Sequence, residues 1–261
     1  MSEKMTTYFT TSWDDGHPLD RKLGELLLRH GMAGTFYCPL KNAEGLPVMQ
    51  AAELAALERD GAGAIELGSH TLEHAYADRM PEEQWQRQVL QGKAALEAAL
   101  GHAVAGFCYP GGRLARHSRT TVQGAGFAYA RTTENLRFDC GADPLLVPTS
   151  LQFYPHNRRV LVRNYVRRGH WVQRLQCAQA ALSETQLERR LERAFQSCNS
   201  VGGVFHLWGH SWEIESLGLW GLLDNFLARV AELVPRPQRL TNAGVLRAVG
   251  LLGKNLTSAS P

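Results

Sequence analysis

The chain has 261 residues, of which 44% are hydrophobic and 20% are charged, and its formal net charge is +3 at pH 7. This length fits a single α/β domain, and this apolar content is enough for a large core. Because the net charge is small and no apolar run approaches the length of a membrane span, we expect neither a nucleic-acid partner nor a transmembrane segment.

Strand and helix patterns alternate along the chain. Short apolar strands are predicted at residues 8–12, 35–38, 64–67, 104–109, 128–132, 145–149 and 204–208. Amphipathic helices are predicted at residues 18–30, 51–59, 81–100, 184–197 and 219–233. This alternation predicts an α/β fold, a distorted (β/α) barrel with mostly parallel strands.

A Pro-Arg-Pro break at residues 235–237 interrupts the alternation. We therefore expect a catalytic domain over residues 1–235 and a C-terminal extension over residues 236–261. Residues 240–252 can form a last helix, which we expect to pack on the barrel.

The compartment is predicted from the amino terminus and the cysteines. Residues 1–7 carry no apolar stretch typical of a secretion signal. The cysteines are odd in number and widely spaced, without a Cys-x-x-Cys pair, which is typical of free thiols in a reducing compartment: Cys38, Cys108, Cys140, Cys177 and Cys198. We therefore expect a cytoplasmic protein.

Two histidines spaced four apart, His70 and His74, lie downstream of the pair Asp14-Asp15. Each group follows a predicted strand, and α/β barrels build their active sites at the carboxyl ends of strands. Within one helical turn, the two imidazoles would lie on one face. Two imidazoles and one carboxylate suit a catalytic zinc, and the second carboxylate is then free to act as a base. The alternatives are two surface histidines and an ordinary Asp-Gly turn.

Two later segments carry groups that a metal-dependent hydrolase could use. The turn at residues 109–112, Tyr-Pro-Gly-Gly, can present a backbone N–H to an oxyanion, although it can also be a simple loop. His206 and His210 follow on one strand, where one of them can protonate a leaving amine. We favour His210, at the carboxyl end of the strand, and keep His206 as the alternative. One of the two is expected to be buried among aromatic residues.

Four motifs resemble those of the NodB-homology polysaccharide deacetylases, carbohydrate esterase family 4. Residues 11–16, Thr-Ser-Trp-Asp-Asp-Gly, are similar to the first motif, and residues 70–74, His-Thr-Leu-Glu-His, to the second. Residues 107–112, Phe-Cys-Tyr-Pro-Gly-Gly, resemble a variant of the third, and residues 205–210 occupy the place of the last. The agreement in order and spacing covers roughly residues 8 to 235.

The resemblance implies a role for each matching position. Asp15, His70 and His74 would bind the metal, which is zinc by first preference and cobalt, nickel or iron otherwise. Asp14 would be the general base. The resemblance also implies that the N–H of Gly111 holds the oxyanion and that a late histidine acts as the acid. We count Tyr109, His206 and Arg113 with Gly111 as oxyanion or substrate contacts.

The chain departs from the family pattern at three places. Many members carry an arginine two residues before the proline of the third motif, where it orients the base, and here that residue is Cys108. Arg113 or Arg116 could take over this role. The usual tyrosine after that proline is Gly111, and residues 130–134, Ala-Arg-Thr-Thr-Glu, stand where the fourth motif is expected.

Residues 144–183 contain no Asp or Glu. The basic residues of this segment are Arg158, Arg159, Arg163, Arg167, Arg168 and Arg174. One interpretation is a solvated face that pairs with acids elsewhere. A second is a clamp for substrate phosphate, because guanidinium binds phosphate with two hydrogen bonds. A third is peripheral docking to anionic lipid headgroups.

We expect a metal-dependent hydrolase that removes an N-acetyl group from an acetamido sugar. In the cytoplasm, the substrate would be a nucleotide- or lipid-linked intermediate of surface polysaccharide synthesis. Three alternatives stay open: another small amide such as a formamide or ureide, a non-catalytic relative that binds sugar or metal, and an inverted zincin whose His-x-x-Glu-His pattern would make Glu73 the base.

Overall fold

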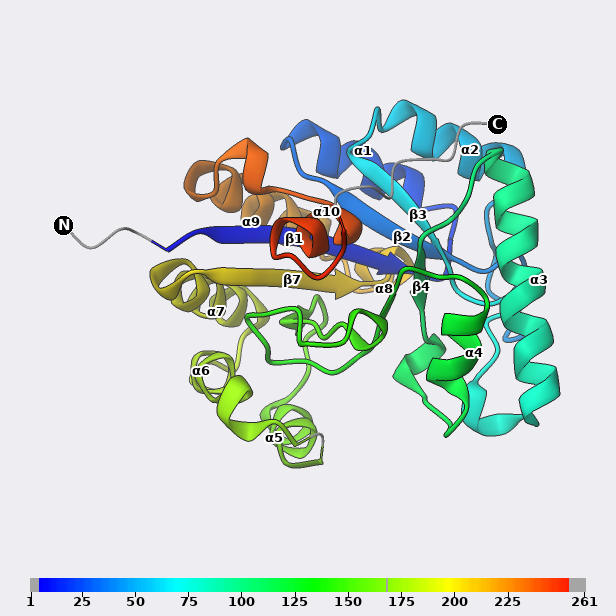
Figure 1. The fold of residues 1–261 in the computed structure, drawn as a ribbon. Helices are drawn as coiled ribbons and strands as arrows, with labels where there is room; N and C mark the ends of the chain where they lie inside the picture. Colours follow the sequence, from blue (N-terminus) through cyan, green and yellow to red (C-terminus); the bar gives the residue numbers. More distant parts are fainter. Residues whose placement is uncertain (1–4, 168, 254–261) are drawn as a thin grey trace.

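Seven parallel strands form one curled sheet in the order β5-β4-β3-β2-β1-β7-β6 (Figure 1). The structure, a computed structural model, describes residues 5–167 and 169–253. The strands are β1 (Thr7–Asp14), β2 (Gly34–Cys38), β3 (Ile65–Ser69), β4 (Gly106–Cys108), β5 (Tyr129–Arg131), β6 (Leu151–Gln152) and β7 (Gly203–Gly209). The predicted distorted barrel is confirmed, as a curled half-barrel surrounded by helices.

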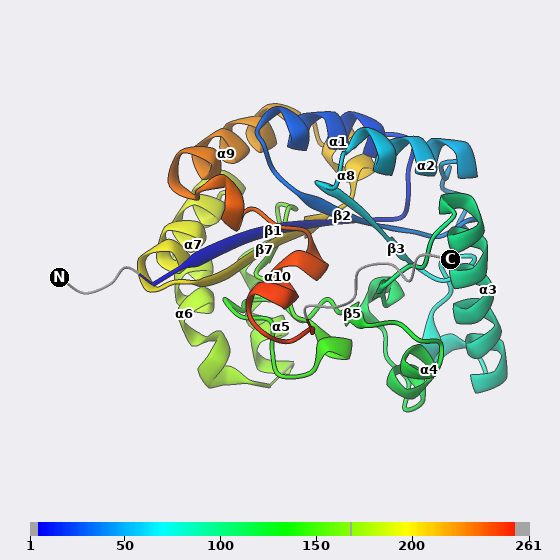
Figure 2. The same ribbon diagram turned by 45° about the horizontal axis from the view of Figure 1, so that its top comes forward.

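Helices cover the outer side of this sheet, and one short helix lies against its inner side (Figure 2). The outer helices include α1 (Asp20–Arg29), α2 (Ala51–Asp60), α3 (Glu82–Leu100), α7 (Leu187–Val201) and α9 (Trp220–Leu233). The others are α4 (Ser118–Gly124), α5 (Arg158–Arg167), α6 (Trp171–Leu182), α8 (Ser211–Ser216) and the inner helix α10 (Asn242–Ala248). Throughout the described residues, each helix is too short or too polar to cross a bilayer.

The two faces of each strand differ because successive side chains point to opposite sides. On β1, Phe9 and Trp13 belong to the large apolar core, whereas Thr10, Ser12 and Asp14 are buried polar residues at the alternate positions. The inner side therefore carries hydrogen-bonding groups, and those at the strand ends are available for chemistry.

The segment between β5 and β6 closes part of the open side of the half-barrel. Val147 makes an isolated parallel bridge to Arg131, and the N–H of Ser150 donates to the carbonyl of His206 at 2.9 Å. The strand predicted at residues 145–149 is wrong, since a 3₁₀ turn at Pro144–Leu146 precedes this single bridge. Pro144 and Pro148 explain the difference, because proline cannot donate to a strand ladder.

The C-terminal extension enters the inner side of the sheet. The Asn242 side chain donates to Thr10 Oγ1 at 2.9 Å and accepts from the Tyr37 hydroxyl at 2.8 Å. Ala243, Val245 and Leu246 are buried there. The described part of the extension packs on the barrel. Residues 254–261 lie outside the described residues, and the division into a domain of residues 1–235 and an extension stays a prediction.

Candidate metal and active site

The carboxyl ends of the strands bring the chemically active side chains to one pocket of about 460 Å³. Asp14 ends β1, His70 directly follows β3, and His210 directly follows β7. Because parallel strands end at the same edge of the sheet, residues far apart in sequence meet there. Asp14, Asp15, His70, His74 and His210 all line this pocket.

Asp15, His70 and His74 each direct one ligand atom to a common point, and these three atoms lie within 4.8 Å of one another. Asp15 Oδ1 is 3.8 Å from His70 Nε2 and 3.3 Å from His74 Nε2. All three residues are buried. One carboxylate and two imidazoles are the donor set of many zinc sites with an open position.

The two histidines do not lie on a helical turn, so that prediction is wrong. Residues 70–74 form a turn in which Thr71 and His74 have positive φ angles of 65° and 56°. The Thr71 hydroxyl fixes this turn by accepting a hydrogen bond from the N–H of Ala75 at 2.8 Å. The imidazole rings nevertheless face the same point, with centroids 5.0 Å apart.

The three residues fit a divalent cation. Asp15 Oδ1 is buried and receives no hydrogen bond from the described residues, whereas Oδ2 accepts the indole N–H of Trp212 at 2.9 Å. His70 donates from Nδ1 to the carbonyl of Cys108 at 2.8 Å, which leaves Nε2 as the electron-pair donor. Burial lowers the pKa of His70 to about 4, so the ring is neutral, as a metal ligand requires.

A second set of three atoms overlaps the first and fits a cation less well. It consists of Asp14, His70 and Cys108. Burial raises the pKa of the Cys108 thiol well above its ordinary value, and metals bind the thiolate. Asp14 is also already paired with an arginine.

Arg131, at the end of β5, is the partner of Asp14. Its guanidinium forms a buried ion pair with Asp14 Oδ1 and lies 4.8 Å from the ring centre of Trp208. Burial opposes ionisation of Asp14, but Arg131, His70 and His210 hold its pKa below the ordinary value. Asp14 is therefore ionised at neutral pH, as a general base must be.

The expectation that Arg113 or Arg116 orients Asp14 is corrected by this pair. Arg113 is exposed and forms an ion pair with Asp78 at 3.2 Å. Arg116 is also exposed. Both follow the third motif in sequence, but the chain there turns away from the pocket, whereas Arg131 arrives on the neighbouring strand.

The structure separates the two late histidines. His210 lines the pocket and donates from Nδ1 to Glu213 at 2.6 Å. Burial disfavours its charged form, but the hydrogen bond to Glu213 and the charge of Asp15 raise the pKa of His210 to about 9. His206 lies deeper, with Nε2 at 2.8 Å from the Ser12 hydroxyl, and burial together with Arg131 lowers its pKa to about 3.

The third motif contributes one residue to the pocket. Gly111 lines it with a φ angle of 58°, and an added Cβ would lie 3.0 Å from the Tyr76 ring. The side chain of Tyr109 is buried in the outer core, where its hydroxyl donates to the carbonyl of Leu145 at 3.1 Å. Tyr109 and Arg113 therefore do not reach the pocket, because the alternation along β4 directs Tyr109 outward.

Comparison with known proteins agrees with this site. The sequence profile described as polysaccharide deacetylase matches residues 3–130, which include the Asp-Asp pair, both histidines of the cluster and the Gly-Gly turn. Residues 3–130 of the chain thus belong to the polysaccharide deacetylase family. The chain is a deacetylase-type hydrolase of amide bonds, with its substrate unspecified. Among curated protein sequences, none matches this chain.

Solved structures with the same fold are distant in sequence. A putative polysaccharide deacetylase from Mycobacterium smegmatis is 15% identical at a TM-score of 0.64, with 100% of this chain and 97% of that chain covered. The chitin deacetylase from Colletotrichum lindemuthianum is 14% identical at 0.60, with coverage of 98% and 93%. A family 4 carbohydrate esterase from Streptomyces lividans in complex with acetate is 14% identical at 0.52, covering 87% and 91%. These likenesses show the fold.

Sequence reasoning missed several residues of this deacetylase site. Arg131 and Glu213 position Asp14 and His210, and Trp212 binds Asp15. Glu44 lies 3.3 Å from His74 Nδ1. Of these residues, only Arg131 could have been placed from the sequence, because residues 129 and 131 of a predicted strand point to the same face of the sheet.

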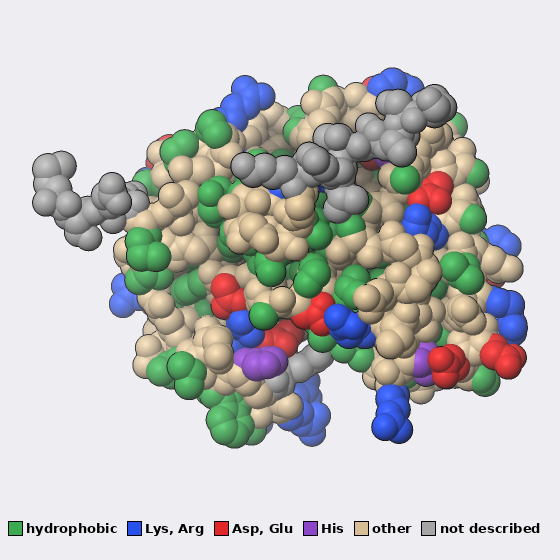
Figure 3. Space-filling view, viewed as in Figure 1, with side chains coloured by type: hydrophobic (Ala, Val, Ile, Leu, Met, Phe, Trp, Pro, Cys, Tyr) green, Lys and Arg blue, Asp and Glu red, His purple; other side chains and the backbone are tan. Residues whose placement is uncertain are grey.

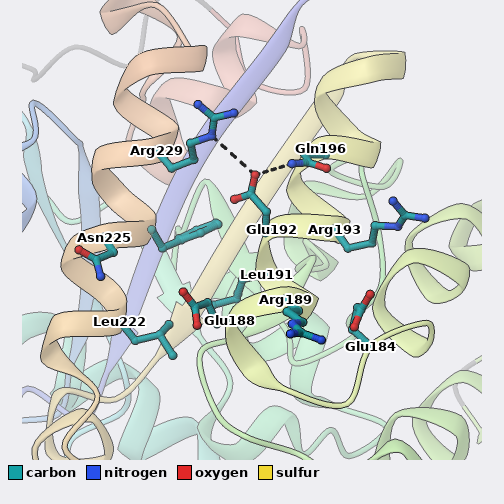
Figure 4. Close-up of a pocket in the computed structure, with 11 residues that line it drawn as sticks. Glu184, Glu188, Arg189, Leu191, Glu192, Arg193, Gln196, Leu222, Asn225 and Arg229 are labelled. Carbon is teal, nitrogen blue, oxygen red and sulfur yellow. Dashed lines mark hydrogen bonds and ion pairs between the residues drawn. The ribbon is translucent and has the colours of Figure 1, made fainter.

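A second hollow, of about 560 Å³, lies between α7 and α9 on the outer side of the protein (Figure 4). One ion pair crosses it, because Glu192 lies 3.6 Å from Arg229, and Glu192 also accepts a hydrogen bond from Gln196 at 2.5 Å. No histidine or cysteine is among its lining residues. We therefore place the chemistry at the strand ends and not in this hollow.

The two histidines make a direct test of the acid. His210→Asn is expected to lower the turnover number by about 10²- to 10⁴-fold, the usual contribution of a positioned acid or base. His206→Asn should instead lower the melting temperature, since it disturbs a buried hydrogen-bond network. Turnover and thermal unfolding of both purified variants decide this. An active His210→Asn protein beside a well-folded, inactive His206→Asn protein would reverse the assignment.

Proposed function

We propose that this chain is a metal-dependent N-deacetylase of an acetamido sugar, carried by a nucleotide or a lipid as an intermediate of surface polysaccharide synthesis. The observation that carries the proposal is the buried, unsatisfied Asp15 Oδ1, which faces two imidazole nitrogens beside the ionised Asp14. A cytoplasmic location is part of the proposal, and the five buried free cysteines support it.

The residues of the pocket divide the work of amide hydrolysis. A divalent ion held by Asp15, His70 and His74, zinc by first preference and cobalt, nickel or iron otherwise, would polarise the acetyl carbonyl and make water more acidic. Asp14 takes the proton from the attacking water, and the Arg131 guanidinium keeps this carboxylate ionised and oriented.

The remaining groups act on the charges that develop on the substrate. Gly111 lets the backbone come close enough to donate its N–H to the oxyanion. His210, held as an imidazolium by Glu213, donates its proton to the leaving nitrogen. Without this proton the amine is a poor leaving group, so the acid is needed as much as the base.

The pocket walls suit a sugar. Tyr76, Trp208 and Trp212 line it together with Asn135 and Gln152. Aromatic rings offer large apolar surfaces to the C–H faces of a sugar ring, and amide side chains can fix its hydroxyl groups.

Acetate release tests the proposal. The purified protein, loaded with Zn²⁺ or Co²⁺, is incubated with a panel of nucleotide-linked and lipid-linked N-acetyl sugars. We expect acetate from at least one of them. Release of formate or of a ureide product from matched substrates would instead favour the other small amides. Metal binding without turnover of any of these substrates would favour a non-catalytic relative.

Metal affinity provides a second prediction that needs no substrate. His74→Asn removes one of three ligands and is expected to weaken zinc binding by at least roughly 100-fold, more than the loss of an outer partner does. Glu73→Gln is the matched control, because Glu73 accepts a hydrogen bond from Gln88 at 2.9 Å and is not part of the cluster. Titration with a competing chelator measures both. An inverted zincin predicts full zinc affinity but no activity for Glu73→Gln.

A further inference from the structure

The α5–α6 hairpin, formed by Arg158–Arg167 and Trp171–Leu182, exposes an unusual number of apolar side chains. Five of the eleven large exposed apolar residues of the described chain lie within residues 162–175, with exposed fractions from 46% to 85%: Val162, Val166, Trp171, Val172 and Leu175. Figure 3 shows hydrophobic side chains gathered over this hairpin, at the lower left. Single exposed apolar residues are normal, but a cluster marks an interaction surface.

The same hairpin carries positive charge without compensation. Arg158, Arg159, Arg163 and Arg167 are exposed, and none of them forms an ion pair or side-chain hydrogen bond with another described residue. No acidic residue occurs between residues 144 and 183. These arginines are solvated, as the first interpretation expected, but within the described residues they are not paired with acids.

A buried arginine holds the hairpin in shape. Arg174 donates to the carbonyls of Asn164, Tyr165 and Gly169, which lie at the end of α5 and in the turn after it. It also donates to the carbonyl of Asn135 at 2.8 Å. These polar contacts fix the hairpin together with its buried side chains, among them Leu161 and Cys177, so the five exposed apolar residues are not needed to hold it in place.

The hairpin is continuous with the catalytic pocket. Val160, Arg163 and Asn164 of α5 line that pocket, as does Asn135, to which Arg174 is bound. A membrane or a macromolecule that contacts the exposed side of the hairpin would therefore lie beside the opening of the pocket.

We infer that the α5–α6 hairpin docks on an anionic lipid bilayer and thereby presents the catalytic pocket to a lipid-linked sugar. The substrate part of this inference rests on the proposed function, whereas the docking part does not. Interfacial protein segments combine basic residues with tryptophan and aliphatic side chains, as this hairpin does. Anionic headgroups complement the four arginines, and the apolar side chains enter the acyl boundary.

Two other occupants explain the surface less well. A free phosphate ligand would use the arginines but leave the five apolar side chains in water. A second copy of the chain would use the apolar residues, but a two-fold contact places the same patch against itself, so the arginines of both copies would repel.

Flotation with lipid vesicles tests the docking. Wild type is mixed with vesicles of phosphatidylcholine alone or with about one third phosphatidylglycerol, an anionic content chosen for its surface potential. We expect flotation only with the anionic vesicles. Val172→Asp, and separately Arg159→Glu with Arg167→Glu, should each lower the partition coefficient by on the order of tenfold or more.

Matched controls lie on α3, on another side of the protein. Leu90 is 44% exposed and Arg87 is exposed, so Leu90→Asp and Arg87→Glu repeat the chemical changes away from the hairpin. They should bind vesicles as wild type does. All variants should hydrolyse a water-soluble acetamido sugar at the wild-type rate, because none of the substituted residues lines the pocket.

The outcomes separate the docking from the proposed function. The inactive Asp14→Asn protein should float as wild type does, because docking does not require catalysis. If wild type floats but deacetylates none of the sugars, only the proposed function is overturned. Absence of flotation by wild type would overturn the docking, as would equal losses in the α3 controls. A dimer in solution that Val172→Asp converts to monomers would also overturn it, in favour of self-association.

Discussion

Replacing Asp14 by asparagine is expected to lower acetate release by about 10²- to 10⁴-fold at a temperature where the variant is still folded. Asparagine keeps the shape of the side chain but cannot accept a proton from water. Asp14 is buried, paired with Arg131 and ionised at neutral pH, so it is placed to accept the proton of the attacking water. The measurement is the rate of acetate release at saturating substrate.

Asp20 provides a matched control for this variant. It is also a buried aspartate near the pocket, and burial raises its pKa well above the ordinary value, which favours the protonated form. Asparagine is close in shape to a neutral aspartic acid, so Asp20→Asn should retain activity. If both variants lose activity and neither folds normally, the loss reflects general damage to the protein and not the removal of a base.

Replacing Arg131 by methionine is expected to have the second largest effect, on stability as well as activity. The change leaves Asp14 buried without its partner, and breaking such a pair costs about 3–5 kcal/mol of the free energy of unfolding. Denaturant unfolding at pH 7 measures this loss. A variant as stable as wild type would contradict the buried ion pair.

The pH dependence of activity gives the direction of the electrostatic effect. Arg131 lowers the pKa of Asp14, so its removal raises that pKa, and Asp14 then stays protonated up to a higher pH. The acidic limb of the rate profile should move to higher pH in Arg131→Met. In the double variant with Asp14→Asn, much of the lost stability should return, because no unpaired charge remains buried.

The fold could be predicted because most of its strands have a local signature. Residues 8–12, 35–38 and 204–208 are short apolar runs with β-branched and aromatic residues, and they lie within β1, β2 and β7. The strand predicted at 145–149 is wrong because Pro148 within it and Pro144 before it cannot donate to a strand ladder. Helices α4 and α8 were not predicted, since each is only one or two turns long and its pattern is too short to read.

The residues of the cluster were predicted from motif order, whereas their geometry was not. The spacing of His70 and His74 suggested a helical turn, but Thr71 and His74 have positive φ angles. This turn contains no glycine or asparagine, the residue types that would indicate such angles. The spacing nevertheless places both rings at one point, because a tight turn also returns the chain after four residues.

The partner of Asp14 could not be found by looking near the third motif. Arg131 is 117 residues away from Asp14 in sequence, and the contact exists because β1 and β5 both direct side chains to the inside of the curled sheet. Arg113 and Arg116 were nearer in sequence to the expected position and are exposed. The one local signal was that residues 129 and 131 of a predicted strand point to the same face of the sheet, which places the Arg131 side chain on that face.

Anomalous diffraction at the zinc edge, from crystals grown with Zn²⁺, shows directly which residues hold the ion. We expect one strong peak bound by Asp15 Oδ1, His70 Nε2 and His74 Nε2, with Asp14 beside it but paired with Arg131. A peak bound instead by Asp14, His70 and Cys108, or no peak at the strand ends, would contradict the assignment of ligands and base.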